Sequence, residues 1–309
     1  MADKGKYPQS VIDRCYNYVN GDSGGYSGSG LEGISVMTTV STEIKRILKE
    51  KNAAIRSGKE TMDAIITELH NQAVNALGRA ALGSWDSYYL TELIRTLEEH
   101  MDNYRAKAKQ NLSGLLDDMW AAGTGMVDSA LTLGGMYSGF RISTSSLDAL
   151  KDYSNGYLEK LFGDTWYSMK SEINLGILGA KTPQEVADAI GLTIDEGLFK
   201  HSLLRAETIT QTEMGRIFST ATQTRMNEAS VYVPGLEKQW VHAGHPREPR
   251  MSHLIAHGQH VPVDQPFVVG GTTMMYPHDT AGPISEIIHC GCDHVPYHPQ
   301  WEQTKKEAD

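Results

Sequence analysis

The sequence predicts an α+β protein: a large, elongated α-helical N-terminal domain followed by a small, loop-rich α+β C-terminal module. Two observations lead to this fold class. From about Thr42 to Ala229 the composition favours Leu, Ala, Met, Glu, Lys and Arg, and apolar residues recur every three or four positions, the period of an amphipathic helix. After Gly235, Pro, Gly and His become frequent, and nine of the twelve histidines follow Trp240. This change in composition indicates a domain boundary.

The first 40 residues are expected to form a flexible N-terminal arm. The run GDSGGYSGSGLEG, from Gly21 to Gly33, is too rich in Gly and Ser to bury enough apolar surface to order itself. The preceding stretch YPQSVIDRCYNYVN has apolar residues at helical spacing and predicts a short docking helix. The predicted domains are therefore the arm at 1–40, a helical domain at 41–235 and the C-terminal module at 236–309.

Within the helical domain, three patterns predict individual helices. Residues 85–120 contain no Pro and a single late Gly, so we expect one long helix there. The sequence TPQE, which begins at Thr182, supplies an N-cap, a Pro in the first turn and an acidic residue near the positive helix end. A further helix is expected from Asp195 to Glu228, ended by the Pro-Gly pair that follows. After that pair, the β-prone pieces KQWVHA, QHVPV and PFVVGG predict short strands.

The segment from Trp120 to Phe140 has Asp128 as its single charged residue, so membrane contact is one interpretation of it. Its small residues favour a helix packed tightly against its neighbours, in which Gly135 and Gly139 permit close backbone approach. We therefore expect this segment to belong to the core and predict no membrane partner.

The charge balance disfavours a general attraction to nucleic acid or to an anionic membrane. The chain has 28 basic and 38 acidic side chains, which give a formal net charge of −10. Contact with DNA would need a local basic patch, for which Arg205, Arg216 and Arg225 are the candidates. Glu213 lies near them in sequence and is expected on an exposed ion-pair face. The N-terminus lacks the pattern of a secretory signal, so we expect folding in a cytoplasm.

A cluster near the C-terminus, HCGCDHVPYHP, has the residue types of a metal site. Cys290 and Cys292 lie one residue apart, and with only three cysteines in the chain a close pair is more typical of metal binding than of a disulfide framework. The stretch HAGHPREPRMSHLIAHGQH adds further candidate ligands: His242, His245, His253, His257 and His260. Leu254 stands where a zinc-peptidase HExxH motif needs Glu, which excludes that hydrolase class.

The structural hypothesis is a zinc site made by Cys290, Cys292 and two of these histidines. Four protein ligands would close such a site, which favours a structural over a catalytic ion. The alternative is that the cysteines form a buried apolar pair and the histidines belong to a solvated loop. Nearby, Asp279 and Glu286 are candidates to orient the ligating imidazoles, and Arg250 is expected to orient a loop rather than to bind a ligand.

Five separated sequence elements follow one another between Ala206 and Pro296. They are TQTEMGRIFSTATQTRMNEA, KQWVHAG, PREPRMSH, HGQHVPVDQPF and YPHDTAGPISEIIHCGC. In this order they resemble the phage Mu protein F-like family, also called the phage head morphogenesis or minor head protein family. The helical first two thirds of the chain carry no motif that matches it.

The resemblance can be followed residue by residue. The positions that match the family's motifs are Thr212, Glu213, Trp240, Arg250, His253, Gly258, Pro266, Phe267, Asp279, Cys290 and Cys292. The departures are Gln211 in place of Arg, His278 in place of Gly, His289 in place of Asn and Gly291 in place of Arg. His245 stands where members often carry Asp; because both residues ligate zinc, the exchange would preserve a metal position. With the resemblance, the expected zinc ligands are Cys290, Cys292, His253 and one of His245, His257 or His242, with His245 preferred.

The resemblance implies a minor capsid protein of a tailed bacteriophage, acting in head assembly and in DNA packaging or ejection. The expected location is the virion, at the capsid interior or portal vertex, after assembly in the host cytoplasm. The implied partners are the portal protein, the major capsid or scaffolding protein, and packaged DNA through a local basic patch. No enzymatic activity is expected. The alternative is a metal-dependent hydrolase, nuclease or toxin-like enzyme built on the same C-terminal module.

Overall fold

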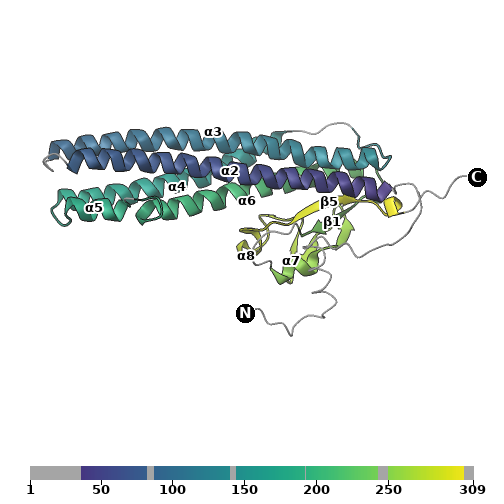
Figure 1. Cartoon of the computed structure of the whole chain (residues 1–309). Coiled ribbons are helices and arrows are strands. Elements are labelled where there is room, and N and C mark those ends of the chain that lie inside the picture. The colour runs from purple at the N-terminus through teal and green to yellow at the C-terminus, as the bar shows by residue number, and fades with distance from the viewer. Residues whose placement is uncertain (1–35, 82–86, 140–143, 192, 243–249, 303–309) are drawn as a thin grey trace, which may run out of the picture. The chain divides into compact units, whose positions relative to one another are not determined.

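The computed structural model describes residues 36–81, 87–139, 144–191, 193–242 and 250–302. It confirms the mixed α+β class, because a long helical region precedes a small module that contains strands (Figure 1). Residues 1–35, which hold the predicted docking helix and the Gly/Ser-rich run, lie outside the described residues.

The helical region consists of α2 (Val36–Ala81), α3 (Ser87–Leu133), α4 (Ser145–Ile177), α5 (Pro183–Ile190) and α6 (Gly197–Ser230). The helix expected over 85–120 is confirmed and continues to Leu133, and the helix expected over 195–228 is also confirmed. The predicted start of α5 is a capping box. The Thr182 hydroxyl accepts a hydrogen bond from the backbone N–H of Glu185, and the Glu185 carboxylate accepts one from the backbone N–H of Thr182.

The chain divides into two compact units that are each discontinuous in sequence. The first unit comprises residues 1–52, 119–143 and 215–309, and the second comprises residues 53–118 and 144–214. Helices α2, α3 and α6 each continue from one unit into the other. The first unit therefore contains all the strands together with the ends of three long helices.

The second unit is a helical bundle with a regular apolar stripe. Along α3, buried side chains recur every three or four residues, so that one face of the helix enters the core. The stripe within this unit consists of Leu90, Leu93, Leu97, Met101, Tyr104, Ala108, Leu112 and Leu116. At the bundle surface, ion pairs join neighbouring helices: Lys59 with Glu207, Lys109 with Glu159, Lys151 with Asp117, and Arg205 with Asp164.

In the first unit, the end of α3 packs closely against the end of α6. Gly123 makes this approach possible, since a Cβ atom at that position would lie 2.5 Å from the backbone oxygen of Phe218. The segment predicted to be core is confirmed as such, with Met126, Val127, Ala130 and Leu131 fully buried. A Cβ atom at Gly139 would overlap the ring of Tyr232, so the close approach expected at this residue is confirmed. A Cβ atom at Gly135 would meet no atom within 4 Å, so the close approach predicted there is wrong.

The C-terminal module contains an antiparallel sheet with the strand order β2-β1-β5 and a separate hairpin of β3 and β4. The strands are β1 (Glu237–Val241), β2 (His260–Pro262), β3 (Phe267–Val269), β4 (Thr272–Met274) and β5 (Asp293–Tyr297). Two short helices, α7 (Met251–Ala256) and α8 (Ile284–Ile287), and the 3-10 helix η1 (Pro299–Glu302) complete it. The three β-prone pieces of the sequence correspond to β1, β2 and β3.

The expected exposed ion-pair face and basic patch on α6 are wrong. Glu213 is 2% exposed and accepts a hydrogen bond from the Ser154 hydroxyl at 2.7 Å. Arg225 is 1% exposed, and its guanidinium donates to the Asp128 carboxylate and to the Gly139 carbonyl oxygen. Arg216 is buried as well. Arg205 is exposed, but it pairs with Asp164, so the three arginines do not form one basic patch.

No helix among the described residues combines the length and the apolar character needed to cross a bilayer.

Two glycines on α3 allow the effect of close packing on stability to be measured apart from the effect of helix propensity. We expect Gly123→Ala to destabilise the protein by about 1–3 kcal/mol, because the added methyl group overlaps Phe218. A Cβ atom at Gly125, two residues later, would meet no atom within 4 Å, so Gly125→Ala should stabilise the helix by about 1 kcal/mol. Chemical denaturation of both variants measures the difference, and an equal effect of the two substitutions would contradict the close helix contact.

Candidate metal site

Two segments of the C-terminal module, α7 and the loop between α8 and β5, bring the predicted ligands together. His253 lies in α7, Cys290 lies in the loop after α8, and Cys292 lies directly before β5. In β5, the pairing with β1 fixes the position of the chain from Asp293 onward. The Arg250 guanidinium donates a hydrogen bond to the carbonyl oxygen of Ile288 at 2.5 Å, which fastens the start of α7 to the loop before Cys290. Arg250 thus has the loop-orienting role that was expected.

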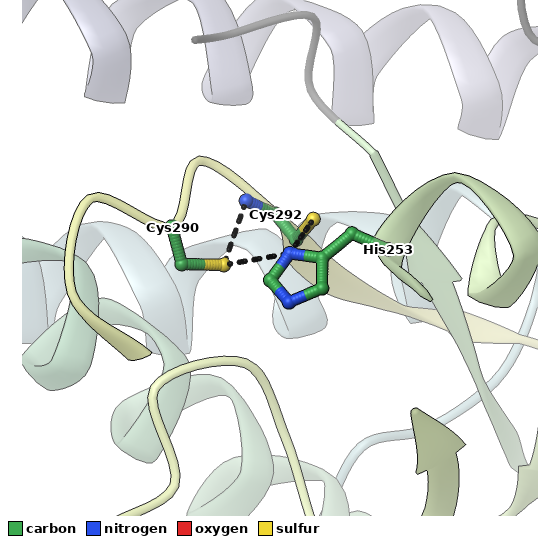
Figure 2. Close-up of side chains that lie close together, drawn as sticks. All are labelled: His253, Cys290 and Cys292. Atoms are coloured by element: carbon green, nitrogen blue, oxygen red, sulfur yellow. Dashed lines mark hydrogen bonds between the residues drawn. The ribbon is translucent and has the colours of Figure 1, made fainter. Parts of the chain in front are cut away.

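The side chains of His253, Cys290 and Cys292 converge on one point (Figure 2). The Nδ1 atom of His253 lies 3.5 Å from the Cys290 sulfur and 3.3 Å from the Cys292 sulfur. Two ligands of one tetrahedral zinc ion, at roughly 2.3 Å for sulfur and 2.0 Å for nitrogen, would lie about 3.5 Å apart. The three donor atoms therefore have the spacing that a shared metal ion requires.

A carboxylate fixes which nitrogen of His253 faces the sulfur atoms. The Nε2 atom of His253 lies 2.8 Å from Oε2 of Glu286, and the same carboxylate oxygen accepts a hydrogen bond from the Ser252 hydroxyl at 2.9 Å. A proton held on Nε2 toward Glu286 leaves the lone pair of Nδ1 directed at the cysteines. Carboxylates orient metal-ligating histidines in this way. Glu286 is therefore placed to orient His253, the role predicted for it; the two atoms are close, but their arrangement is not that of a hydrogen bond.

The two thiols differ in acidity because they interact with each other. A hydrogen bond from Cys292, assisted by the nearby His278 and His253, lowers the pKa of Cys290 well below its usual value despite burial. Burial raises the pKa of Cys292 well above its usual value, and the interaction with Cys290 raises it further. The pair thus holds its first negative charge readily and its second only at a high energy, which a cation would offset.

The site is enclosed by apolar side chains. Its cysteines belong to a buried cluster that contains Trp240, Ala256, Phe267, Val269, Met274, Ile287, Cys290 and Cys292. The Trp240 ring meets the edge of His253 with ring centroids 5.8 Å apart, and His253 itself is 2% exposed. A buried group of this kind is stable only when its polar atoms have partners, which the thiols and the imidazole supply to one another or share through an ion.

The candidate histidines for a fourth ligand differ in their burial and in their contacts. His242 is buried, and its Nδ1 atom lies 3.4 Å from the Cys292 sulfur, a separation that matches those of His253. The Nδ1 atom of His257 accepts a hydrogen bond from the backbone N–H of His242, so it is already engaged. His260 is exposed and contacts Glu237 instead. His245, the preferred candidate from sequence, lies outside the described residues. Of the other two candidates, His242 has a ring nitrogen close to the Cys292 sulfur, but it does not belong to the group of three ligand atoms that all lie close to one another.

No protein-family model, curated protein or solved structure matches this chain. The geometry alone therefore carries the assignment. It shows a buried group of His253, Cys290 and Cys292 that is compatible with a metal site.

Near the site, Asp279 has a role that differs from the predicted one, and Lys51 has a role that was not predicted from the sequence. Asp279, a candidate to orient a histidine, instead accepts hydrogen bonds from the backbone N–H groups of Met275 and Ala281 and shapes its own loop. Lys51 in α2 donates to the carboxylate of Asp293 at 2.5 Å, and both side chains are buried. Burial raises the pKa of Asp293, while Lys51 opposes that rise. Because 242 positions separate the two residues, no local pattern could have revealed this pair.

The contact between His253 and Glu286 predicts a specific effect on metal affinity. We expect Glu286→Ala to weaken binding of a divalent ion by about 10–100-fold, because His253 loses the group that orients it. A titration against a competing chelator of known affinity measures this change. Glu237→Ala, which removes a carboxylate from the exposed His260, is the matched control and should leave the affinity unchanged. Equal affinity in the two variants would show that Glu286 does not support a metal ligand.

Proposed function

We propose that this protein is a minor head protein of a tailed bacteriophage whose C-terminal module is held together by a structural zinc ion. The observation that carries the proposal is the convergence of separated sequence elements. Trp240, Phe267, Cys290 and Cys292, which come from different elements of the Mu F-like resemblance, belong to one buried cluster, and His253 packs against it. Four of the five elements that carry the resemblance thus meet in one module, which supports treating these four as parts of a single domain.

Zinc is the ion that the donor set favours. Two thiolates and one or two imidazoles are soft or borderline ligands, which zinc accepts in tetrahedral geometry without redox chemistry. Hard cations such as Mg²⁺ and Ca²⁺ prefer oxygen ligands. With His242 as the fourth ligand, the ion would have no open position for water, and the burial of His253, Cys290 and Cys292 supports the same conclusion. A zinc ion with four protein ligands stabilises a fold rather than activating a nucleophile.

The remaining parts of the proposal concern the place of the protein in the particle. As a minor capsid component it would lie at the capsid interior or portal vertex and contact the portal protein and the major capsid or scaffolding protein. The proposal includes no direct DNA contact through α6, because Arg216 and Arg225 are buried. A hydrolase or nuclease on the same module is the competing function. The enclosure of the three ligands disfavours it, since a substrate would need access to the ion.

Metal content is the first test of the zinc assignment. We expect the purified protein to contain about one zinc ion per chain by elemental analysis and to melt at a lower temperature after a chelator removes it. Cys292→Ser should lose the metal, whereas Cys15→Ser, which changes the third cysteine of the chain, should keep it. Metal-free protein with unchanged melting would refute the zinc site and leave the head-protein proposal to the next experiment.

Incorporation into particles tests the head-protein proposal itself. In the phage whose genome encodes this chain, we expect mass spectrometry of purified heads to detect the protein in modest copy number and cross-linking to join it to the portal protein. Cys15→Ser should be incorporated as well as the unmodified chain, and Cys292→Ser should be depleted because its C-terminal module is destabilised. Purified heads that contain none of the unmodified protein would refute the proposal, whatever the metal content.

A further inference from the structure

A groove of about 250 Å³ lies in the first unit between the start of α2 and one face of the sheet. From α2, side chains with the spacing of a single helix face line it: Met37, Val40, Ser41, Ile44, Lys45 and Leu48. From the sheet, alternate residues of two paired strands line it: Gln239 and Val241 in β1, and Val295 and Tyr297 in β5. Pro296 of β5, His257 and Gly258 after α7, and Trp301 of η1 complete the lining. The groove is therefore mostly apolar, with Lys45 exposed at its rim.

The chain itself supplies a segment that ends at this groove. Helix α2 begins at Val36, and its second residue, Met37, already lines the groove. The 35 residues before Val36 must therefore connect to the chain at the end of the groove. The seven residues that follow Glu302 also start nearby, but their sequence QTKKEAD offers no large apolar side chain to fill an apolar groove. The N-terminal segment is the better candidate.

The N-terminal sequence has the pattern of a helix that binds in an apolar groove. Ile12, Cys15, Tyr16 and Val19 follow one another at positions i, i+3, i+4 and i+7, which places them on one face of a helix. Ser10 and Asp13 precede and flank this face with the spacing of a helix N-terminus. Asp13 and Arg14 cancel in charge, so the segment carries no net charge that would oppose its burial.

The length of the intervening run matches the distance to be covered. The 13 residues from Gly21 to Gly33, taken as a Gly/Ser-rich coil, have an average end-to-end distance of roughly 20 Å. The strip of α2 from Met37 to Leu48 is about 17 Å long. A segment tethered on this scale has an effective concentration in the millimolar range, so even a weak intrinsic affinity would keep it docked.

We propose that residues 10–20 dock as an amphipathic helix in this groove of their own chain. In that arrangement, Ile12, Cys15, Tyr16 and Val19 face α2 and the strands β1 and β5. The N-terminal arm then covers apolar side chains of the unit that contains the metal site. This inference does not depend on the proposed function, and the experiment below uses the purified full-length chain.

Disulfide trapping with the native Cys15 tests the docking. Lys45→Cys places a thiol at the rim of the groove, and Arg46→Cys places one on the neighbouring exposed residue, which does not line it. Under a mild oxidant we expect an intramolecular disulfide to Cys15 to form on the order of tenfold faster with Lys45→Cys than with Arg46→Cys. Mass spectrometry identifies the joined cysteines, and a non-reducing gel shows that the product is a monomer. Adding Ile12→Asp and Tyr16→Asp should remove the difference between the two positions.

Each other outcome overturns the proposal in a defined way. A disulfide-linked dimer through Cys15 and the cysteine at position 45 would show that the segment binds the groove of a second copy. Equal trapping at positions 45 and 46 would show that the arm contacts this surface only by random collision. Trapping that survives the two Asp substitutions would show that the apolar face of the segment is not what binds.

Discussion

The burial of two cysteines and a histidine at the centre of the C-terminal module is the constraint on which the rest of that module depends. Its strands are only three to five residues long, and two of its helices have four and six residues. Elements this short bury little apolar surface, so small modules commonly need an additional cross-link or metal to remain folded. Here His253 comes from α7 while Cys290 and Cys292 come from the loop before β5, and their mutual contact joins these two segments.

The same burial explains why charged residues of the helices matter to the module. Asp293 directly follows Cys292 and is fully buried, so an unpaired carboxylate there would be strongly unfavourable beside a thiolate. Lys51 meets this carboxylate from α2 and also lies over the ring of Phe218 in α6. The first unit therefore needs a helix segment from the beginning of the chain to satisfy a charge next to its C-terminal cysteine pair. This ion pair is one contact that places the start of α2, residues 36–52, in one compact unit with the C-terminal module.

Sequence patterns predicted the parts of the fold that local chemistry determines. The long helices follow from apolar periodicity, and the start of α5 follows from Thr182 and Glu185, which satisfy each other within one turn. They failed where tertiary neighbours decide. Arg225 and Glu213 look like surface residues in sequence, but both are buried, and Asp128 and Ser154 supply their partners from distant segments. For the metal site, the cysteine pair was identifiable from residue type and spacing and His253 from the family resemblance, whereas choosing among the other histidines required the positions of β1 and α7.

The choice of histidine also bears on what the site can do. If His242 is the fourth ligand, both His242 and Cys292 flank the paired ends of β1 and β5, where Val241 lies opposite Asp293. The ion would then bridge the sheet and α7 and would stabilise the strands that line the groove beside α2. On our proposal, loss of the ion loosens that sheet and the surface on which the N-terminal arm docks. The metal would thus act through the surfaces that it keeps in shape, which is the behaviour expected of an assembly component rather than of an enzyme.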